Sequence, residues 1–144
     1  PKVKVNPWKT ELIHLDLAID RKEFPLIKTG YNPPGKRKLL YIGHTAWYKN
    51  TEFLEILAQK LPHIHFSWTG SGRELINIAS LGTIDFSEKY AHNLLREYDF
   101  LIMPSSSDAN PTTILEAMAW GIIPVCSVQS GYEGFNSIPN SLET

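Results

Sequence analysis

Apolar residues along the chain fall into short runs that alternate with segments of helical spacing. Four runs, rich in branched and aromatic side chains, predict strands at 39–42, 64–68, 100–103 and 122–126. The run 76–81 suits either a strand or the end of a short helix, and the glycine that follows it favours the strand. Strands that alternate with helices are typical of an α/β fold with a parallel sheet.

Two of the helical segments have clear start and stop signals. The first follows Asn50, which can cap it, and ends before Pro62. Its apolar stripe predicts one buried face. The other starts at Asn110-Pro111, because Asn can cap free N–H groups and Pro suits the first helical position, and it ends at Gly121.

A third helix is expected between these two. Ser87 offers its N-cap, and apolar residues repeat at helical spacing as far as Tyr98. That spacing predicts that Tyr90, Leu94 and Tyr98 all lie in the core.

Both ends of the chain are predicted to be irregular. Prolines and glycines interrupt residues 1–36, and the folded domain is expected to begin near Lys36. After residue 126, two glycines and a proline predict a loop to the end. Because the sequence starts at Pro1 and stops soon after that loop begins, we expect a fragment cut from a longer protein.

Composition narrows the class of protein. With 42% hydrophobic and 20% charged residues, the 144-residue chain is neither disordered, coiled coil nor collagen-like. Its net charge of -1 argues against an electrostatic nucleic-acid binder. No apolar run approaches the roughly 18 residues of a membrane span. The single cysteine, Cys126, excludes an internal disulfide and fits a reducing, cytoplasmic setting.

Small and polar residues follow several predicted strands, where ligands bind in open parallel sheets. They stand at 43–44, 69–72, 105–108 and 127–131. The helix that begins at Pro111 offers free N–H groups and a favourable dipole to an anion, and Lys49 adds a positive charge. The expected occupant is a phosphorylated small molecule.

Residues 108–125, DANPTTILEAMAWGIIPV, carry a specific pattern. Two acidic residues, Asp108 and Glu116, have seven residues between them, and Ala-Met-Ala-x-Gly and a strand with Pro-Val follow. This resembles the signature of the family 4 retaining glycosyltransferases. Weaker similarities, at 17–24, 41–43, Lys49-Asn50 and 100–105, occur in the family's order.

The resemblance implies the nucleotide-sugar-binding, C-terminal half of a two-domain GT-B enzyme, with a Rossmann-like sheet and helices on both faces. Residues 1–36 would be the lead-in from a missing N-terminal domain, and residues 37–144 a donor domain truncated at its C-terminus. The enzyme would be a hexosyltransferase of polysaccharide biosynthesis, and this fragment would not catalyse transfer alone. A glycan or lipid-linked acceptor would be held by the missing domain, and the full-length enzyme would suit peripheral association with the inner face of a membrane. No cofactor or metal is implied, because the fold uses a helix dipole and a lysine instead.

The same resemblance implies roles for individual residues. Asp108 and Lys49 are the candidate catalytic residues: Lys49 would neutralise the leaving diphosphate, and Asp108 would hold hydroxyls of the donor sugar. Glu116 would accept hydrogen bonds from the ribose. The remaining donor contacts would be Gly43, His44, Gly70, Gly82 and Thr83 near the base and phosphates, the backbone of Ala109 and Asn110 at the sugar, and Thr112 and Thr113 at the diphosphate.

Three departures from the family pattern keep other functions open. His44 stands where the family has Arg, Asp108 replaces a Glu, and Ala109-Asn110 replaces Gly-Phe. The alternative is a degenerate, non-catalytic α/β module that binds a nucleotide or a protein. A flavodoxin-like regulatory domain fits less well, because the first strand lacks paired acids and a phosphate loop.

Overall fold

A parallel sheet forms the centre of the molecule. The computed structural model describes residues 17–108, 111–131 and 137–138. Within them six strands run in the order β3-β2-β1-β4-β5-β6, and each neighbouring pair is parallel. The strands are β1 (Lys38–Ile42), β2 (His65–Thr69), β3 (Ala79–Ser80), β4 (Phe100–Met103), β5 (Ile123–Ser127) and β6 (Ser137–Ile138). The predicted parallel α/β fold is confirmed.

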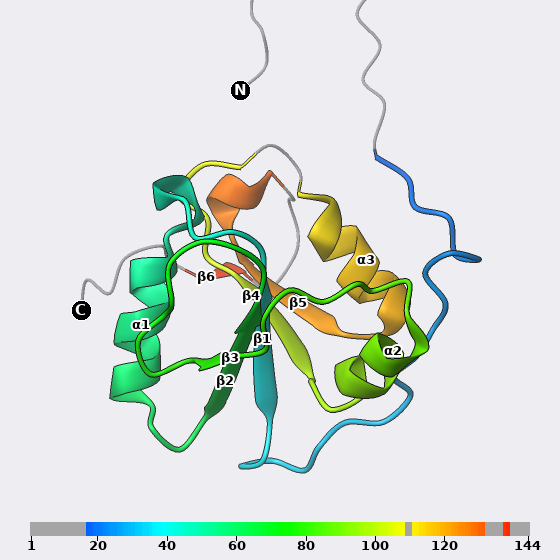
Figure 1. Cartoon of the computed structure of the whole chain (residues 1–144), viewed down its shortest axis with the longest axis horizontal. Helices are drawn as coiled ribbons and strands as arrows, with labels where there is room; N and C mark the ends of the chain where they lie inside the picture. Colours follow the sequence, from blue (N-terminus) through cyan, green and yellow to red (C-terminus); the bar gives the residue numbers. More distant parts are fainter. Residues whose placement is uncertain (1–16, 109–110, 132–136, 139–144) are drawn as a thin grey trace, which may run out of the picture.

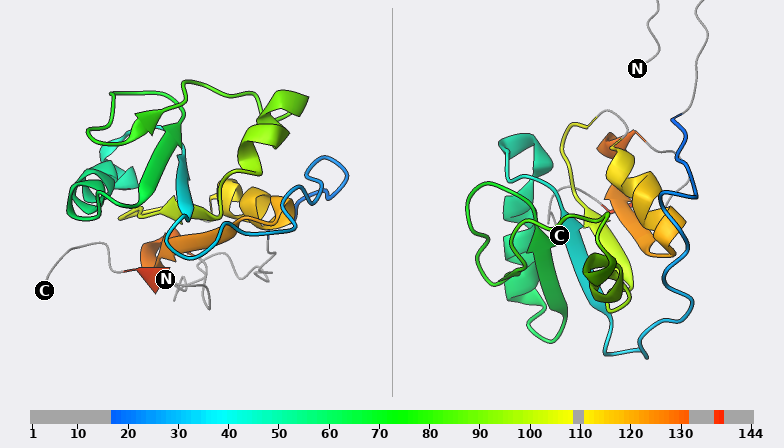
Figure 2. Two further views of the ribbon diagram at one scale, coloured as in Figure 1. Left: turned by 90° about the horizontal axis from the view of Figure 1, so that it is seen from below. Right: turned by 45° about the vertical axis from the view of Figure 1, so that its right-hand side comes forward.

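Helices cover both faces of this sheet. Figures 1 and 2 show α1 (Thr51–Lys60) on one face, and α2 (Lys89–Leu95) and α3 (Thr112–Trp120) on the other. Two single 3-10 turns, η1 (Trp47–Lys49) and η2 (Val128–Ser130), follow β1 and β5. The predicted Rossmann-like arrangement is confirmed.

The two central strands, β1 and β4, each place a leucine in the centre of the core. Leu40 of β1 and Leu101 of β4 are fully enclosed, with 0% exposure. A parallel sheet covered on both faces needs nearly continuous apolar strands, as in FLIM of β4. From β1 the chain crosses to β2 on one side, and β4 lies on the other side. The carboxyl ends of β1 and β4 therefore flank a topological switch point, where ligands bind in such sheets.

Residues before β1 also pack on the domain. The backbone N–H groups of Ile27 and Lys28 both donate to the carbonyl of Trp120, at 3.0 and 2.8 Å. Gly121 ends α3 with φ +88°, and a Cβ there would lie 2.4 Å from the Lys28 carbonyl oxygen. A glycine is thus required at this position both by the helix end and by the close approach of the preceding segment.

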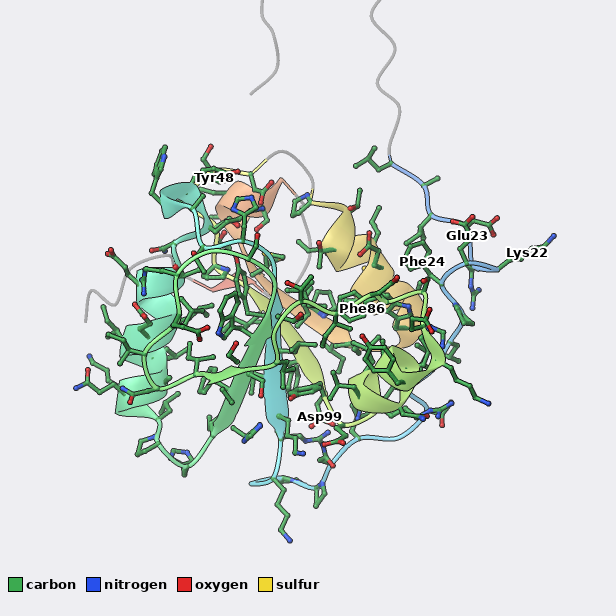
Figure 3. The ribbon with its side chains drawn as sticks, in the orientation of Figure 1. Lys22, Glu23, Phe24, Tyr48, Phe86 and Asp99 are labelled. Carbon is green, nitrogen blue, oxygen red and sulfur yellow. The ribbon has the colours of Figure 1, made fainter. Side chains whose placement is uncertain are left out.

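Asp99 ties that segment to the amino end of β4. Its carboxylate is fully buried and accepts hydrogen bonds from the Asn32 and Lys38 backbone, at 2.8 and 3.0 Å, and contacts the Lys28 ammonium at 3.3 Å. Burial alone raises the pKa of Asp99, but the hydrogen bonds from Lys38, Asn32 and Lys28 lower it to about 2. Figure 3 shows Asp99 at the end of the sheet opposite to Tyr48.

Some predicted elements differ in extent. The strand expected at 76–81 is only Ala79–Ser80, because Leu75 and Ile78 turn into the core around Asn77, whose φ is +61°. The loop expected after residue 126 contains β6, which pairs with β5. That part of the prediction is wrong, since a two-residue strand at a sheet edge leaves no periodic signal.

Helix starts also shift. Asn50 is the N-cap residue of α1, as predicted, but its side chain makes no cap bond and donates to the Pro104 carbonyl instead. Glu88 rather than Ser87 precedes α2, because the Ser87 hydroxyl bonds to Asp85 at 2.6 Å.

Two further predictions about these helices need correction. Tyr90 is 56% exposed, so its predicted place in the core is wrong. Tyr98 is buried but lies past the end of α2, and Leu94 is partly buried against the core. Pro111 is the N-cap of α3 rather than its first residue, and Asn110 lies outside the described residues.

Replacing Asp99 with Asn should destabilise the fold by about 3 kcal/mol at neutral pH, because it leaves Lys28 buried without its counter-charge. The native carboxylate stabilises the fold above its unfolded pKa, near 4, and this contribution is lost as pH falls towards 2. The difference between wild type and Asp99→Asn in urea unfolding should therefore shrink over that range.

Asp85→Asn, on an exposed loop, is the matched control and should change stability little. An Asp99→Asn protein with unchanged stability, or with the same acid dependence as the wild type, would contradict this role.

Candidate functional site

The loops that follow β1 and β4 are fastened to each other at the switch point. The Ser106 backbone N–H donates to the Tyr48 carbonyl at 2.8 Å. The Asn50 side-chain amide donates to the Pro104 carbonyl at 3.2 Å. These bonds hold η1 against the loop after β4, so residues distant in sequence share one small region.

Lys49 and Asp108 form an ion pair in this region. The Lys49 ammonium contacts Oδ2 of Asp108, and both side chains are 13% exposed. The Ser105 hydroxyl donates to the same oxygen at 3.2 Å. The Lys49 ammonium also lies 5.5 Å from the centre of the Tyr48 ring, a cation–π distance. The fold thus brings the two predicted catalytic residues into direct contact.

Buried serines hydrogen-bond to one another next to this pair. Ser105, Ser127 and Ser130 all have 0% exposure. The Ser127 hydroxyl donates to the Ser105 carbonyl, and it lies 3.2 Å from the Ser130 hydroxyl. Because every partner is enclosed, the network fixes the backbone at Ser105 and therefore the position of Asp108. Ser105 belongs to the polar stretch predicted at the end of a strand, although no individual role was predicted for it. Tyr48 was not predicted as a site residue, and its adjacency to Lys49 was the available signal.

Tyr41 and His44 shape the loop after β1. The buried Tyr41 hydroxyl donates to the His44 carbonyl at 2.7 Å. Burial, together with the nearby charges of Asp108 and Tyr48, raises the pKa of Tyr41, so it remains a donor. The His44 ring accepts the Ala46 N–H at Nδ1, 3.3 Å away, and its Nε2 lies 3.1 Å from the Tyr48 hydroxyl. The His44 ring is thus engaged within its own loop, at the position where the family pattern has an arginine.

A glycine-lined stretch of backbone continues the site across β1, β2 and β3. A Cβ on Gly70, whose φ is +145°, would lie 2.0 Å from the Gly43 carbonyl oxygen. The Gly70 N–H donates to the Gly82 carbonyl at 3.2 Å, and the Thr83 hydroxyl donates to the Gly70 carbonyl at 3.2 Å. These four predicted donor-binding residues therefore lie together.

Glu116 occupies a different place. It lines a cavity of about 220 Å³ between α3 and the segment before β1, together with Thr112, Asp20, Glu23 and Phe24. Figure 3 shows Glu23 and Phe24 on the side of the molecule away from Tyr48. Neither Lys49 nor Asp108 lines this cavity. Thr113 is half-buried in the first turn of α3, and Ala109 and Asn110 lie outside the described residues.

Comparison with known sequences identifies the class of protein. The model of the family described as "Glycosyl transferases group 1" matches residues 36–138. The chain belongs to this family. No curated protein sequence matches it.

Solved structures agree on the fold. A C-terminal domain of a glycosyl transferase group 1 family protein (LpcC) from Francisella tularensis matches with TM-score 0.56 and 18% identity, over 81% of this chain and 74% of that one. Sucrose-phosphate synthase from Thermosynechococcus elongatus matches with TM-score 0.57 and 17% identity, over 70% of this chain and 30% of that one. The apo structure of OtsA matches with TM-score 0.59 and 13% identity, over 86% and 39%. The chain therefore spans well under half of the last two proteins.

Among residues 17–108, 111–131 and 137–138, no helix has the length and apolar character needed to cross a membrane. The same part of the chain holds no cluster of three or more His, Cys, Asp or Glu side chains placed to bind a metal ion.

Gly70→Ala should destabilise the protein by roughly 2–3 kcal/mol, because the new methyl group meets the Gly43 carbonyl and the backbone is left-handed. Gly30→Ala is the control, since a Cβ at Gly30 meets nothing within 4 Å. Urea unfolding compares the two. Equal effects would show that the close approach of these backbones is not required.

Proposed function

We propose that this chain binds a nucleoside-diphosphate sugar at the carboxyl ends of β1 and β4, as the donor domain of a retaining hexosyltransferase. The observation that carries the proposal is the Lys49–Asp108 pair, a cation and a carboxylate held together at the switch point of the sheet. Membership of the group 1 glycosyltransferase family supports the same function.

The diphosphate would bind beside Lys49. Gly43 and Gly70 would contribute backbone contacts, and they stand together because a Cβ on Gly70 would meet the Gly43 carbonyl oxygen. The N-terminus of α3, at Thr112 and Thr113, adds free N–H groups and a favourable helix dipole. Thr83 and Gly82, which contact Gly70, would lie beside the base.

Two carboxylates would bind hydroxyl groups of the donor. Glu116 is half-buried on α3, about one turn after Thr112 and Thr113, which suits a carboxylate that accepts hydrogen bonds from ribose hydroxyls next to the diphosphate. Asp108 would accept hydrogen bonds from hydroxyl groups of the sugar. Ala109 and Asn110 follow it in the sequence. Ser105 and Lys49 both contact Oδ2 of Asp108, so neither of these two contacts involves the other carboxylate oxygen, Oδ1.

Transfer breaks the bond between the sugar and the diphosphate, and negative charge grows on the leaving phosphate. Lys49 would stabilise that charge, and a preorganised cation is most effective in a partly enclosed site. The acceptor, a glycan or a lipid-linked sugar, would be held mostly by residues beyond this chain, in a second domain. We propose for the same reason that the chain alone does not catalyse transfer.

The degenerate-module alternative rests on two departures from the family pattern, His44 and Asp108. The His44 ring is engaged by Ala46 and Tyr48 within its own loop. A module of that kind would bind a nucleotide or a protein without catalysing transfer, so transfer activity of the complete protein that disappears with Asp108→Ala would exclude it.

A thermal-shift panel of UDP, GDP and their sugars tests the proposal. A true donor ligand at a hundred times its Kd should raise Tm by roughly 8 °C. Lys49→Ala and Glu116→Ala should each reduce the shift strongly, because they remove the partner of the diphosphate and of the ribose. Lys60→Ala, at the exposed end of α1, is the control for the loss of a cation and should leave the shift unchanged.

If no nucleotide in the panel raises Tm, the donor-domain proposal fails and the degenerate module is favoured. A shift that survives both Lys49→Ala and Glu116→Ala would place the nucleotide elsewhere.

A further inference from the structure

A second cavity, of about 280 Å³, lies beside η1 over the start of α1. Its lining consists of Thr45, Trp47, Asn50, Thr51, Glu52 and Arg73. None of these residues belongs to the donor set proposed above. The cavity is next to that set along the chain, because Trp47 and Lys49 stand at the two ends of η1.

Trp47 presents an open aromatic face here. Its side chain is 83% exposed, more than any other large apolar residue described as exposed. The ring packs roughly perpendicular to Tyr48, with ring centres 5.8 Å apart and planes at 87°. A perpendicular contact with one neighbouring ring covers at most one face of the indole, and at 83% exposure the rest of the side chain is open.

The floor of the cavity is built before any ligand arrives. The Thr45 hydroxyl accepts the Arg73 backbone N–H at 2.8 Å, and the Thr45 N–H donates to the Ser71 carbonyl at 3.1 Å. A Cβ on Gly72 would lie 2.0 Å from the Thr45 hydroxyl oxygen, so the two loops are in close contact. A preformed floor lowers the ordering cost of binding.

Charge excludes an anionic occupant. The Arg73 guanidinium makes a two-pronged contact with Glu55, at 2.6 and 2.7 Å, and this pair offsets its charge. Glu52 adds a further negative charge to the lining. The cavity therefore suits an uncharged ligand that is rich in hydrogen-bonding groups and has one flat apolar face.

We propose that this cavity is a subsite for one sugar ring of the acceptor oligosaccharide. The C–H face of a pyranose is apolar and stacks on an indole, while its hydroxyl groups need polar partners such as the Thr45 hydroxyl and the Glu52 carboxylate. The Tyr48 ring lies between Trp47 and the ion pair. Its centre is 5.8 Å from the centre of the Trp47 ring and 5.5 Å from the Lys49 ammonium. A short oligosaccharide spans that path, so its far end would reach the donor sugar. The term "acceptor" rests on the proposed function, but sugar binding at Trp47 does not.

The test is a titration of the chain with uncharged disaccharides, namely maltose, cellobiose, lactose and diacetylchitobiose, followed by the indole N–H signals in a heteronuclear NMR spectrum. The Trp47 signal is assigned by its absence in Trp47→Phe. At least one disaccharide should move it and leave the signals of the buried Trp68 and Trp120 in place.

Variants of Trp47 test whether its aromatic ring binds the sugar. Trp47→Ala should weaken binding of that disaccharide by about tenfold or more, and Trp47→Phe should restore part of it, because a smaller flat ring remains. Tyr90→Ala is the matched control: Tyr90 is an exposed aromatic residue, and it lies on α2, across the sheet from α1. The Tm shift caused by UDP or GDP should be the same in all these variants.

Disaccharide binding without any nucleotide binding would support the sugar subsite and overturn the donor-domain proposal alone. The inference fails if no disaccharide moves the Trp47 signal, or if Trp47→Ala binds as well as Tyr90→Ala does. It also fails if the Trp47 signal depends on protein concentration and not on sugar, which would assign this face to a second copy of the chain.

Discussion

The pairing of β1 with β4 is the constraint on which the rest of the molecule depends. These strands are neighbours in space although about 60 residues separate them in the chain, and the connections from them lead to opposite sides of the sheet. Helices consequently cover both faces, and the ends of the two strands form the topological switch point of the sheet. The contact between Lys49 and Asp108 follows from that arrangement, because one residue comes after each strand.

The two ends of this strand pair use polar groups differently. At the amino end, Asp99 gathers backbone and ammonium donors in full burial, which fixes the segment before β1 against the domain. At the carboxyl end, Lys49 and Asp108 remain partly exposed, and buried serines hold the backbone beneath them. The first arrangement satisfies its charge internally and serves stability. The second leaves charged groups within reach of a ligand.

Predictions from the sequence succeeded where the signal was a continuous run of apolar residues. The strands of the core and the parallel sheet followed from runs such as 39–42 and 100–103, because burial on both faces demands continuous apolar residues. Predictions failed where a side chain had more than one possible local partner or environment. Ser87 bonds to Asp85 instead of capping α2, and Tyr90 points to solvent because that helix contributes only a narrow face to the core.

By itself, the sequence determined the fold class, the family signature and the identity of the charged pair. The fold class follows from the apolar periodicity, and the signature and the pair follow from the fixed spacing of residues. Only the tertiary structure decided that Asp108 contacts Lys49 while Glu116 lines a separate cavity. It also decided that Trp47 stands exposed beside a second cavity. Both decisions depend on how loops from distant strands meet, and contacts between loops leave no period in the sequence.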